Sequence, residues 1–312
     1  MSFSNFKKKF QDKKISKKEY IEGSLGFHDL LFEYAEIIKS TDIDKITITE
    51  EDVCFLLSGD NIEIVSPRNE SRVAPIEILN FDAYEKEEVT LIDKLTYDCK
   101  SILDVGANIG WFSLHFATQN LNRMVYAFEP VPETFKYLKS NITRNELDGQ
   151  ITCLNYALSD TNGSFKIYVV EANGTNASLK NVSNAENAKE ISCLTITLDE
   201  WCQNFSIMPD FIKCDVEGAE LLVFRGAEVV LAKNKPIIYT ELLRKWSKGF
   251  EYHPNDLLRL LKSLDYICIG INGSSINILS KIDDETIETN FLFLHNVEHK
   301  EKIKMILPDW NK

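Results

Sequence analysis

The sequence lacks the features that mark several large classes of protein. No stretch approaches the ~20 consecutive apolar residues that a transmembrane helix requires. Lysines near the N-terminus are not followed by an apolar segment, so we expect no secretory signal and a cytoplasmic protein. The seven cysteines are an odd number and show no C-x-x-C or Cys/His spacing. They indicate reduced thiols and no zinc site.

The sequence also has fewer basic than acidic residues, 35 against 48. The net charge is −13, and a nucleic-acid backbone would be repelled by it. The [DNS]-P-P-[YFW] motif, typical of enzymes that methylate nucleobases, is absent. A composition of 44% hydrophobic and 27% charged residues is that of a folded globular protein. A chain of 312 residues has room for one large α/β domain and an additional element.

A strand, a glycine turn and a helix are predicted in that order within 101–116. Apolar residues lead to Asp104, Gly106 and Gly110 frame the turn, and an apolar run at helical spacing follows. Such a turn lets the backbone approach a ligand, and the helix start directs unpaired N–H groups toward it. The spacing is not the G-x-G-x-x-G of a dinucleotide site, and without G-K-[ST] a P-loop is excluded. Asp104 would repel a pyrophosphate but attract an ammonium group, which favours S-adenosylmethionine over NAD.

A second predicted strand, 123–128, leads directly to Glu129. An acid about 20 residues after the glycine turn, at the carboxyl end of the next strand, is placed to bind both hydroxyls of a ribose. Alternatively, Glu129 could cap the helix that begins near Pro132. Its combination with Asp104 and the glycine turn in one βαβ unit favours the ribose interpretation.

The rest of the chain alternates between strand-like and helix-like segments. This alternation predicts a doubly wound, mostly parallel α/β sheet. Further strands are predicted at 151–155, 209–215, 236–241, 266–270 and 290–295, and helices at 84–97, 131–146, 217–226 and 255–264. Two strand-like runs within 164–196 predict an inserted hairpin whose loop at 173–178 lies near the ligand edge. A flexible surface loop is the alternative interpretation of that segment.

Residues 1–83 have an α+β pattern of their own. We therefore expect an N-terminal extension, with a role in acceptor binding or in oligomerisation, followed by the large α/β domain at 84–312. A helix is predicted at 23–40 and β structure within 45–80, with a hairpin turn at 59–61.

The first twenty residues carry seven lysines and three phenylalanines at helical spacing, Phe3, Phe6 and Phe10. We expect a surface helix whose aromatic stripe packs on the body of the protein. The alternative is an amphipathic arm that contacts an anionic membrane surface or an acidic partner.

Several motifs together resemble one family. They are DVGANIG (104–110), AFEP (127–130), ALSD (157–160), NGTNASL (173–179) and FIKCDVEGAE (211–220), with an acid at the end of the fifth strand. The chain from about 84 to 296 resembles the FkbM-type S-adenosylmethionine-dependent methyltransferases. The resemblance implies a seven-stranded class I methyltransferase fold, S-adenosylmethionine as cofactor, and O-methylation of sugars in glycans or natural products.

The resemblance also implies roles for individual residues. Glu129 would bind the ribose, Ala157 and Leu158 would flank the adenine, and the methionine part would lie on Asp104, Gly106, Ala107, Asn108 and Gly110. The acceptor-side candidates are Lys213, Asp215, Glu217 and Glu241. Glu217 and Glu220 could instead interact with a helix N-terminus, and Lys213 could be the buried partner of a carboxylate.

Methyl transfer to a sugar hydroxyl needs an aligned acceptor oxygen and a group that takes its proton. We expect Asp215, with Glu241 and Lys213 nearby, to serve this step. Because a sugar hydroxyl is a very weak acid, the carboxylate needs desolvation or a divalent cation to assist it. Two carboxylates alone do not predict a metal site, so none is predicted. The acceptor would be a small molecule or a glycan. An NAD-dependent oxidoreductase and a non-catalytic methyltransferase-like binding protein remain as alternatives.

Overall fold

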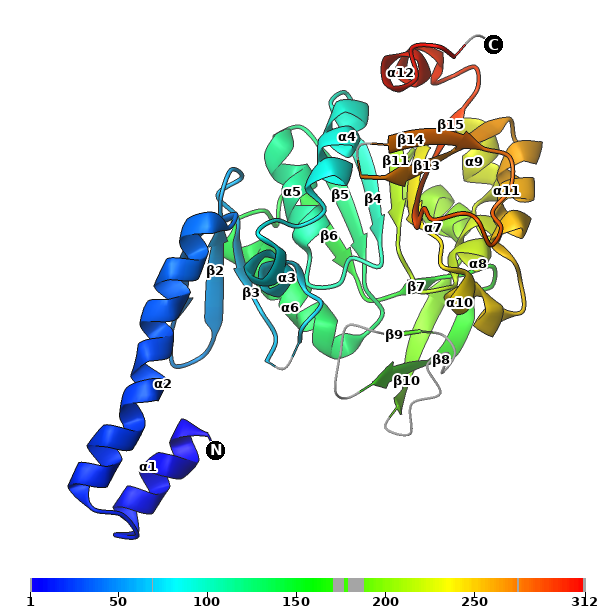
Figure 1. Ribbon diagram of the computed structural model, residues 1–312. Helices are drawn as coiled ribbons and strands as arrows, with labels where there is room; N and C mark the ends of the chain where they lie inside the picture. The colour runs from blue at the N-terminus through cyan, green and yellow to red at the C-terminus, as the bar shows by residue number, and fades with distance from the viewer. Residues whose placement is uncertain (1, 69, 171–176, 179–187, 274, 311–312) are drawn as a thin grey trace.

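The computed structural model describes residues 2–310 except 69, 171–176, 179–187 and 274. Its centre is an eight-stranded sheet (Figure 1). The strand order is β14 (Ser275–Leu279), β13 (Tyr266–Asn272), β15 (Asn290–His295), β12 (Ile237–Glu241), β11 (Phe211–Cys214), β4 (Ser101–Val105), β5 (Met124–Phe128) and β6 (Ile151–Leu154). The last five of these strands are parallel, and β15 runs antiparallel to β12 and β13.

The doubly wound α/β sheet expected of a class I methyltransferase is confirmed, but the expected number of seven strands is wrong. The additional strand, β14, pairs antiparallel with β13 at the edge of the sheet. The chain reverses directly after Asn272, and Gly273 has a φ of +55°. An Asn-Gly pair between two apolar runs is a strong hairpin signal, and it marks this turn in the sequence.

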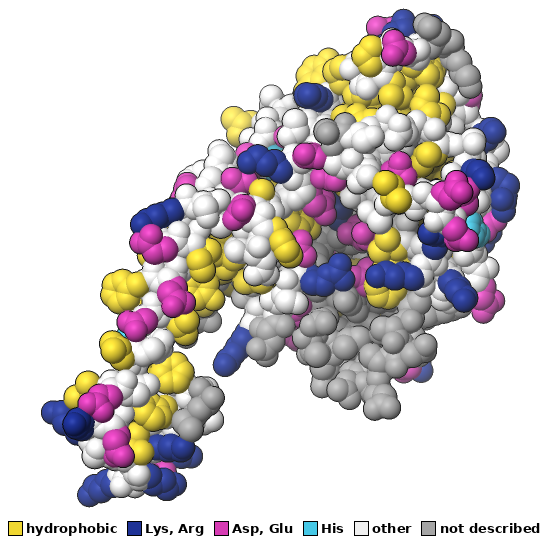
Figure 2. All heavy atoms as spheres, viewed as in Figure 1, with side chains coloured by type: hydrophobic (Ala, Val, Ile, Leu, Met, Phe, Trp, Pro, Cys, Tyr) yellow, Lys and Arg dark blue, Asp and Glu magenta, His cyan; other side chains and the backbone are white. Residues whose placement is uncertain are grey.

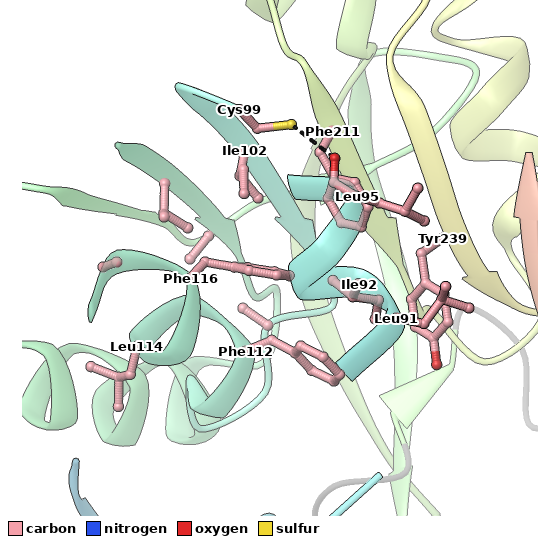
Figure 3. Close-up of a cluster of buried hydrophobic side chains, with 14 of the residues drawn as sticks. Leu91, Ile92, Leu95, Cys99, Ile102, Phe112, Leu114, Phe116, Phe211 and Tyr239 are labelled. Carbon is pink, nitrogen blue, oxygen red and sulfur yellow. Dashed lines mark hydrogen bonds between the residues drawn. The ribbon is translucent and has the colours of Figure 1, made fainter. Parts of the chain in front are cut away.

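The two faces of the sheet bury different cores because successive residues of a strand point to opposite sides. Ile102 and Phe211 belong to one core and Leu103 and Ile212 to the other. The first core is covered by α4 (Lys86–Thr96), α5 (Trp111–Gln119) and α6 (Pro132–Arg144). Helices on the second face include α7 (Leu198–Phe205), α8 (Glu220–Arg225), α9 (Glu228–Asn234) and α11 (Pro254–Ser263). Figure 3 shows side chains of α4 and α5 meeting over β4 and β11.

Four further helical elements are short. They are η1 (Ile38–Ser40), α10 (Arg244–Ser247), η2 (Lys248–Phe250) and α12 (Lys300–Ile306).

A separate four-stranded sheet has the order β7 (Ala157–Leu158), β10 (Ala188–Ile196), β8 (Gly163–Val170), β9 (Ala177–Ser178). Strands β8 and β10 pair antiparallel within the segment interpreted as a hairpin. Most of the predicted 173–178 loop lies outside the described residues.

The N-terminal extension contains a three-stranded antiparallel sheet and a helix: β1 (Ile43–Ile48), β2 (Val53–Leu57), β3 (Glu63–Val65) and α3 (Ala74–Phe81). Two asparagines of α6 bind the backbone of β3. Asn145 exchanges hydrogen bonds with Glu63, and Asn141 Oδ1 accepts the Val65 N–H at 2.8 Å. Asn141 Nδ2 also donates to the Ile109 carbonyl in the glycine turn at 2.9 Å. The fully buried Asn141 therefore connects the extension to the predicted cofactor loop.

A buried histidine makes a second connection. His115 of α5 lies between the carboxylates of Asp60, in the turn before β3, and Asp93 of α4, 2.8 Å away. Burial on its own lowers the pKa of His115, but the two carboxylates raise it to about 9. The imidazolium is therefore the form present at neutral pH, and it joins the extension to both helices.

The first two helices form a hairpin that projects from the body (Figure 1): α1 (Phe3–Gln11) and α2 (Lys17–Ile37). The expectation that the aromatic stripe of α1 packs on the body is wrong. Phe6 and Phe10 stack on Tyr20 of α2, and Phe3 lies against Phe27 of the same helix. Among the described residues, no helix is both long and apolar enough to cross a membrane.

Replacing Asn141 with alanine should destabilise the protein. The substitution leaves the Val65 N–H and the Ile109 carbonyl without their partner, at roughly 1–3 kcal/mol for each group that stays unpaired. The free energy of unfolding in urea measures this loss. The exposed Asn122→Ala should change it by less than about 0.5 kcal/mol. Equal stability of the two variants would show that Asn141 does not hold the extension.

Candidate active site

The glycine turn between β4 and α5 is held closely against the end of β11. Gly106 has a φ of +80°, and a Cβ at this position would lie 1.8 Å from the Asp215 carbonyl oxygen. The N–H groups of Gly106 and Ala107 both donate to the Phe128 carbonyl. These two N–H groups of the turn are therefore bound to β5 and are not available to a ligand, whereas the expectation concerned the N–H groups at the start of α5 and stays a prediction.

Glu129 is the acid at the end of β5, and it is buried. Its carboxylate accepts the N–H groups of Asn108 at 3.0 Å and of Val131 at 2.9 Å. The burial raises the pKa of Glu129 to about 7, against the effect of these two donors. The N-cap of α6 is Val131, so Glu129 does not occupy the capping position considered for it. Each carboxylate oxygen keeps a lone pair that can accept a hydroxyl, and ribose binding stays a prediction.

Asp104 and Lys213 form a buried ion pair behind the turn. Asp104 is completely buried; one carboxylate oxygen accepts the Ser113 hydroxyl at 2.6 Å and the other lies 3.5 Å from Lys213 Nζ. The ammonium also donates to the Gly106 carbonyl and lies 3.9 Å from Asp215. Burial alone would lower the pKa of Lys213, but the carboxylates of Asp104 and Asp215 raise it. Lys213 is therefore protonated at neutral pH and is not available as a base.

A cavity of about 1030 Å³, counting its open mouth, lies beside this turn. Its apolar wall is formed by Phe128, Val131, Ala157, Leu158 and Ile167. This wall has the character that an adenine ring requires. Six of the eight predicted cofactor residues line the cavity: Gly106, Ala107, Asn108, Glu129, Ala157 and Leu158. Asp104 and Gly110 lie behind its lining and support the turn.

Carboxylates gather on the acceptor side of the cavity. Asp215, half exposed, and Glu217 line it, whereas Glu241 does not. The pKa of Glu217 is raised to about 8 by burial and by the negative charge of Asp215, and the same two causes raise that of Glu241 to about 8. The structure thus brings the predicted acids together, although their roles stay untested. Figure 2 shows acidic side chains around the hollow on this face.

Glu220 serves the backbone around α8. Its carboxylate accepts the Gly218 N–H at 2.9 Å and the Tyr252 hydroxyl at 3.0 Å. Burial raises its pKa to about 7. These contacts agree with the alternative interpretation, in which Glu220 interacts with the N-terminus of a helix.

Part of the cavity wall was not predicted from the sequence. Arg72, Val73, Ala74 and Tyr84 come from the extension or from the segment that joins it to α4. No motif marks the first three, and they precede the segment that resembles the family. Trp111 also lines the cavity, and its place directly after the glycine turn was an available signal.

The residues present fit S-adenosylmethionine. The cavity combines a buried acid, an apolar wall and the half-exposed carboxylate of Asp215, which can attract a cation. A group of three or more His, Cys, Asp or Glu side chains spaced to bind a metal does not occur among the described residues.

The raised glutamate pKa values predict that stability depends on pH. A folded-state pKa above 4.5 means that the folded protein holds this proton more tightly than the unfolded chain. The contribution of Glu241 to stability is complete below pH 4.5 and is lost as the pH rises through about 8. In urea titrations without ligand, wild-type stability should fall over this range relative to Glu241→Gln. The exposed Glu133→Gln should follow the wild type. Parallel curves for wild type and Glu241→Gln would contradict the assigned pKa.

Residues 104–268 match the model of the methyltransferase FkbM domain. The hexuronic acid methyltransferase AglP of Haloferax volcanii is 32% identical over 145 residues, which are 46% of this chain and 56% of AglP. Methyltransferase sdnD of Sordaria araneosa is 26% identical over 155 residues, 41% of this chain and 60% of sdnD. The chain thus matches less than two thirds of the length of either relative.

A solved structure of an FkbM methyltransferase from Methylobacillus flagellatus has a TM-score of 0.41 and 16% identity. The match covers 64% of this chain and 44% of that one. The FkbM domain model spans more than half of the sequence, and its match includes the glycine turn, Glu129 and the acids after β11. The protein therefore belongs to the FkbM methyltransferase family.

Proposed function

We propose that the protein transfers a methyl group from S-adenosylmethionine to a hydroxyl oxygen of a sugar, either free or within a glycan. One observation carries the proposal. A single cavity has the predicted cofactor turn and Glu129 on one side, and the carboxylates of Asp215 and Glu217 on the other. The similarity to a hexuronic acid methyltransferase supports a sugar as the acceptor.

On the cofactor side, Glu129 would bind the ribose hydroxyls. Ala157 and Leu158 would lie against the adenine, and the turn at 106–110 would border the methionine part. When bound, S-adenosylmethionine supplies an electrophilic methyl group on a sulfonium. The protein must then position the acceptor oxygen and take its proton.

On the acceptor side, Asp215 is the best placed base. It lines the cavity and is half exposed, so an incoming hydroxyl can reach it. The protonated Lys213, 3.9 Å away, would help to orient its carboxylate. Glu241 does not line the cavity, and burial and the charge of Asp215 raise its pKa to about 8, so at neutral pH it would compete less well than Asp215 as the base.

The N-terminal extension would complete the acceptor site. Arg72 lines the same cavity and lies outside the FkbM match. Burial and the charge of Asp215 raise the pKa values of Glu217 and Glu241, and the positive charge of Arg72 opposes this effect by lowering both. We therefore assign the extension a part in acceptor binding. The domain division at residue 83 remains part of this proposal.

Removing the Glu129 carboxylate should weaken cofactor binding. Glu129→Ala should reduce the binding free energy of S-adenosylhomocysteine by roughly 1.5–3 kcal/mol, the range for hydrogen bonds to charged groups. Isothermal titration calorimetry measures the change, and the exposed Glu133→Ala is the control. Unchanged affinity in Glu129→Ala would remove this residue from the site.

The reaction is tested with the purified protein, S-adenosylmethionine and a panel of neutral sugars and hexuronic acids. Mass spectrometry should detect a methylated product with at least one of them. Asp215→Asn should bind the cofactor normally but lose ~10²–10⁴ in turnover, the usual effect of removing a positioned base. The exposed Asp309→Asn should retain the wild-type rate.

A chelator distinguishes two roles of Asp215. Loss of activity on chelation would show that Asp215 acts through a divalent cation, whereas unchanged activity fits direct proton removal. If Asp215→Asn methylates the acceptor at the wild-type rate, the catalytic assignment is wrong.

A further inference from the structure

The hairpin of α1 and α2 is hardly buried by the rest of the chain. Helix α1 has no buried residue, and in α2 only Ser24 is buried. The hairpin projects away from the central sheet, and apolar side chains line it on the visible face (Figures 1 and 2). In water, a helix with apolar residues on most sides is normally covered by a neighbour.

Seven large apolar side chains of α2 are exposed. They are Ile21, Leu25, Leu30, Leu31, Phe32, Tyr34 and Ile37, with exposed fractions between 41% and 72%. They lie on two sides of the helix: Ile21, Leu25 and Phe32 share one face, and Leu30, Tyr34 and Ile37 lie on the opposite one. The three side chains of the first face expose roughly 400 Å² per chain, or about 800 Å² for two chains, so the residues that flank this face must supply the rest of a stable interface.

The spacing along one face of α2 is symmetric. Ile21, Leu25, His28 and Phe32 follow one another at intervals of four, three and four residues, the spacing of a coiled-coil seam. If a second α2 runs antiparallel about the midpoint of this seam, Ile21 faces Phe32 and Leu25 faces His28. A two-fold axis needs such a self-complementary surface.

The charge pattern favours the same arrangement. Residues 1–24 contain seven lysines and three acids, whereas 25–38 contain three acids and neither lysine nor arginine. Antiparallel pairing places the lysine-rich end of each hairpin beside the acidic half of the other. On this register Lys18 of one chain lies beside Glu36 of the other, on the flank of the seam.

We propose that the protein forms a two-fold symmetric dimer in which α2 pairs antiparallel with α2 of a second copy. The four helices of the two hairpins then form one bundle. An anionic membrane is the less suitable occupant, because the phenylalanines of α1 already pack on α2 and three acids lie within the apolar half of α2.

The proposal is tested by sedimentation equilibrium of the full-length protein. The wild type should be a dimer at micromolar concentration. Leu25→Asp combined with Phe32→Asp should raise the dimer dissociation constant by at least about 100-fold, because it places charges in an apolar contact. Ile287→Asp changes an equally exposed side chain on the body and should leave the dimer intact. Circular dichroism verifies that each variant is folded.

A charge exchange tests the register. Within one α2, Lys18 and Glu36 are ~27 Å apart and cannot pair. Lys18→Glu alone should weaken the dimer, and adding Glu36→Lys should restore it, which only contact between two chains can explain. A monomeric wild type, or a dimer that Leu25→Asp with Phe32→Asp does not affect, would overturn the proposal. A monomer whose hairpin binds anionic vesicles would overturn it in favour of a membrane contact.

Discussion

The buried ammonium of Lys213 is the interaction on which the site depends. It lies among the carboxylates of Asp104 and Asp215 and the carbonyl of Gly106, so it joins the ends of β4 and β11. Breaking a buried ion pair from one side typically costs about 3–5 kcal/mol, because the remaining charge stays unpaired. The close approach of Gly106 to the Asp215 backbone is possible only while these strand ends are held together.

The N-terminal extension is bound to the central domain by specific polar contacts. Asn141 and Asn145 bind β3 as a neighbouring strand would, and the His115 imidazolium holds the turn before it. These contacts fix the segment that contributes Arg72 and Val73 to the cavity wall. The FkbM match alone, at 104–268, would therefore leave the cavity open on one side.

The sequence predicted the strands and the cavity residues that a local sequence pattern marks. Gly106, Glu129 and Asp215 directly follow buried strands, and parallel strands place their carboxyl ends at one edge of the sheet. The strand β14 and the packing of α1 were not predicted correctly. The Asn272-Gly273 signal for the first was present in the sequence but was overlooked, whereas the second depends on contacts between helices rather than on periodicity. Arg72 could not be found, since its place in the wall results from the distant contacts of Asn141.

Asn141 connects the extension and the cofactor turn through one side chain. One amide group binds Val65 of the extension and Ile109 of the cofactor turn, which are far apart in sequence. If the turn binds the cofactor and Arg72 binds the acceptor, as proposed, this amide lies between the two ligands. By thermodynamic linkage each ligand would then change the affinity for the other by the same factor.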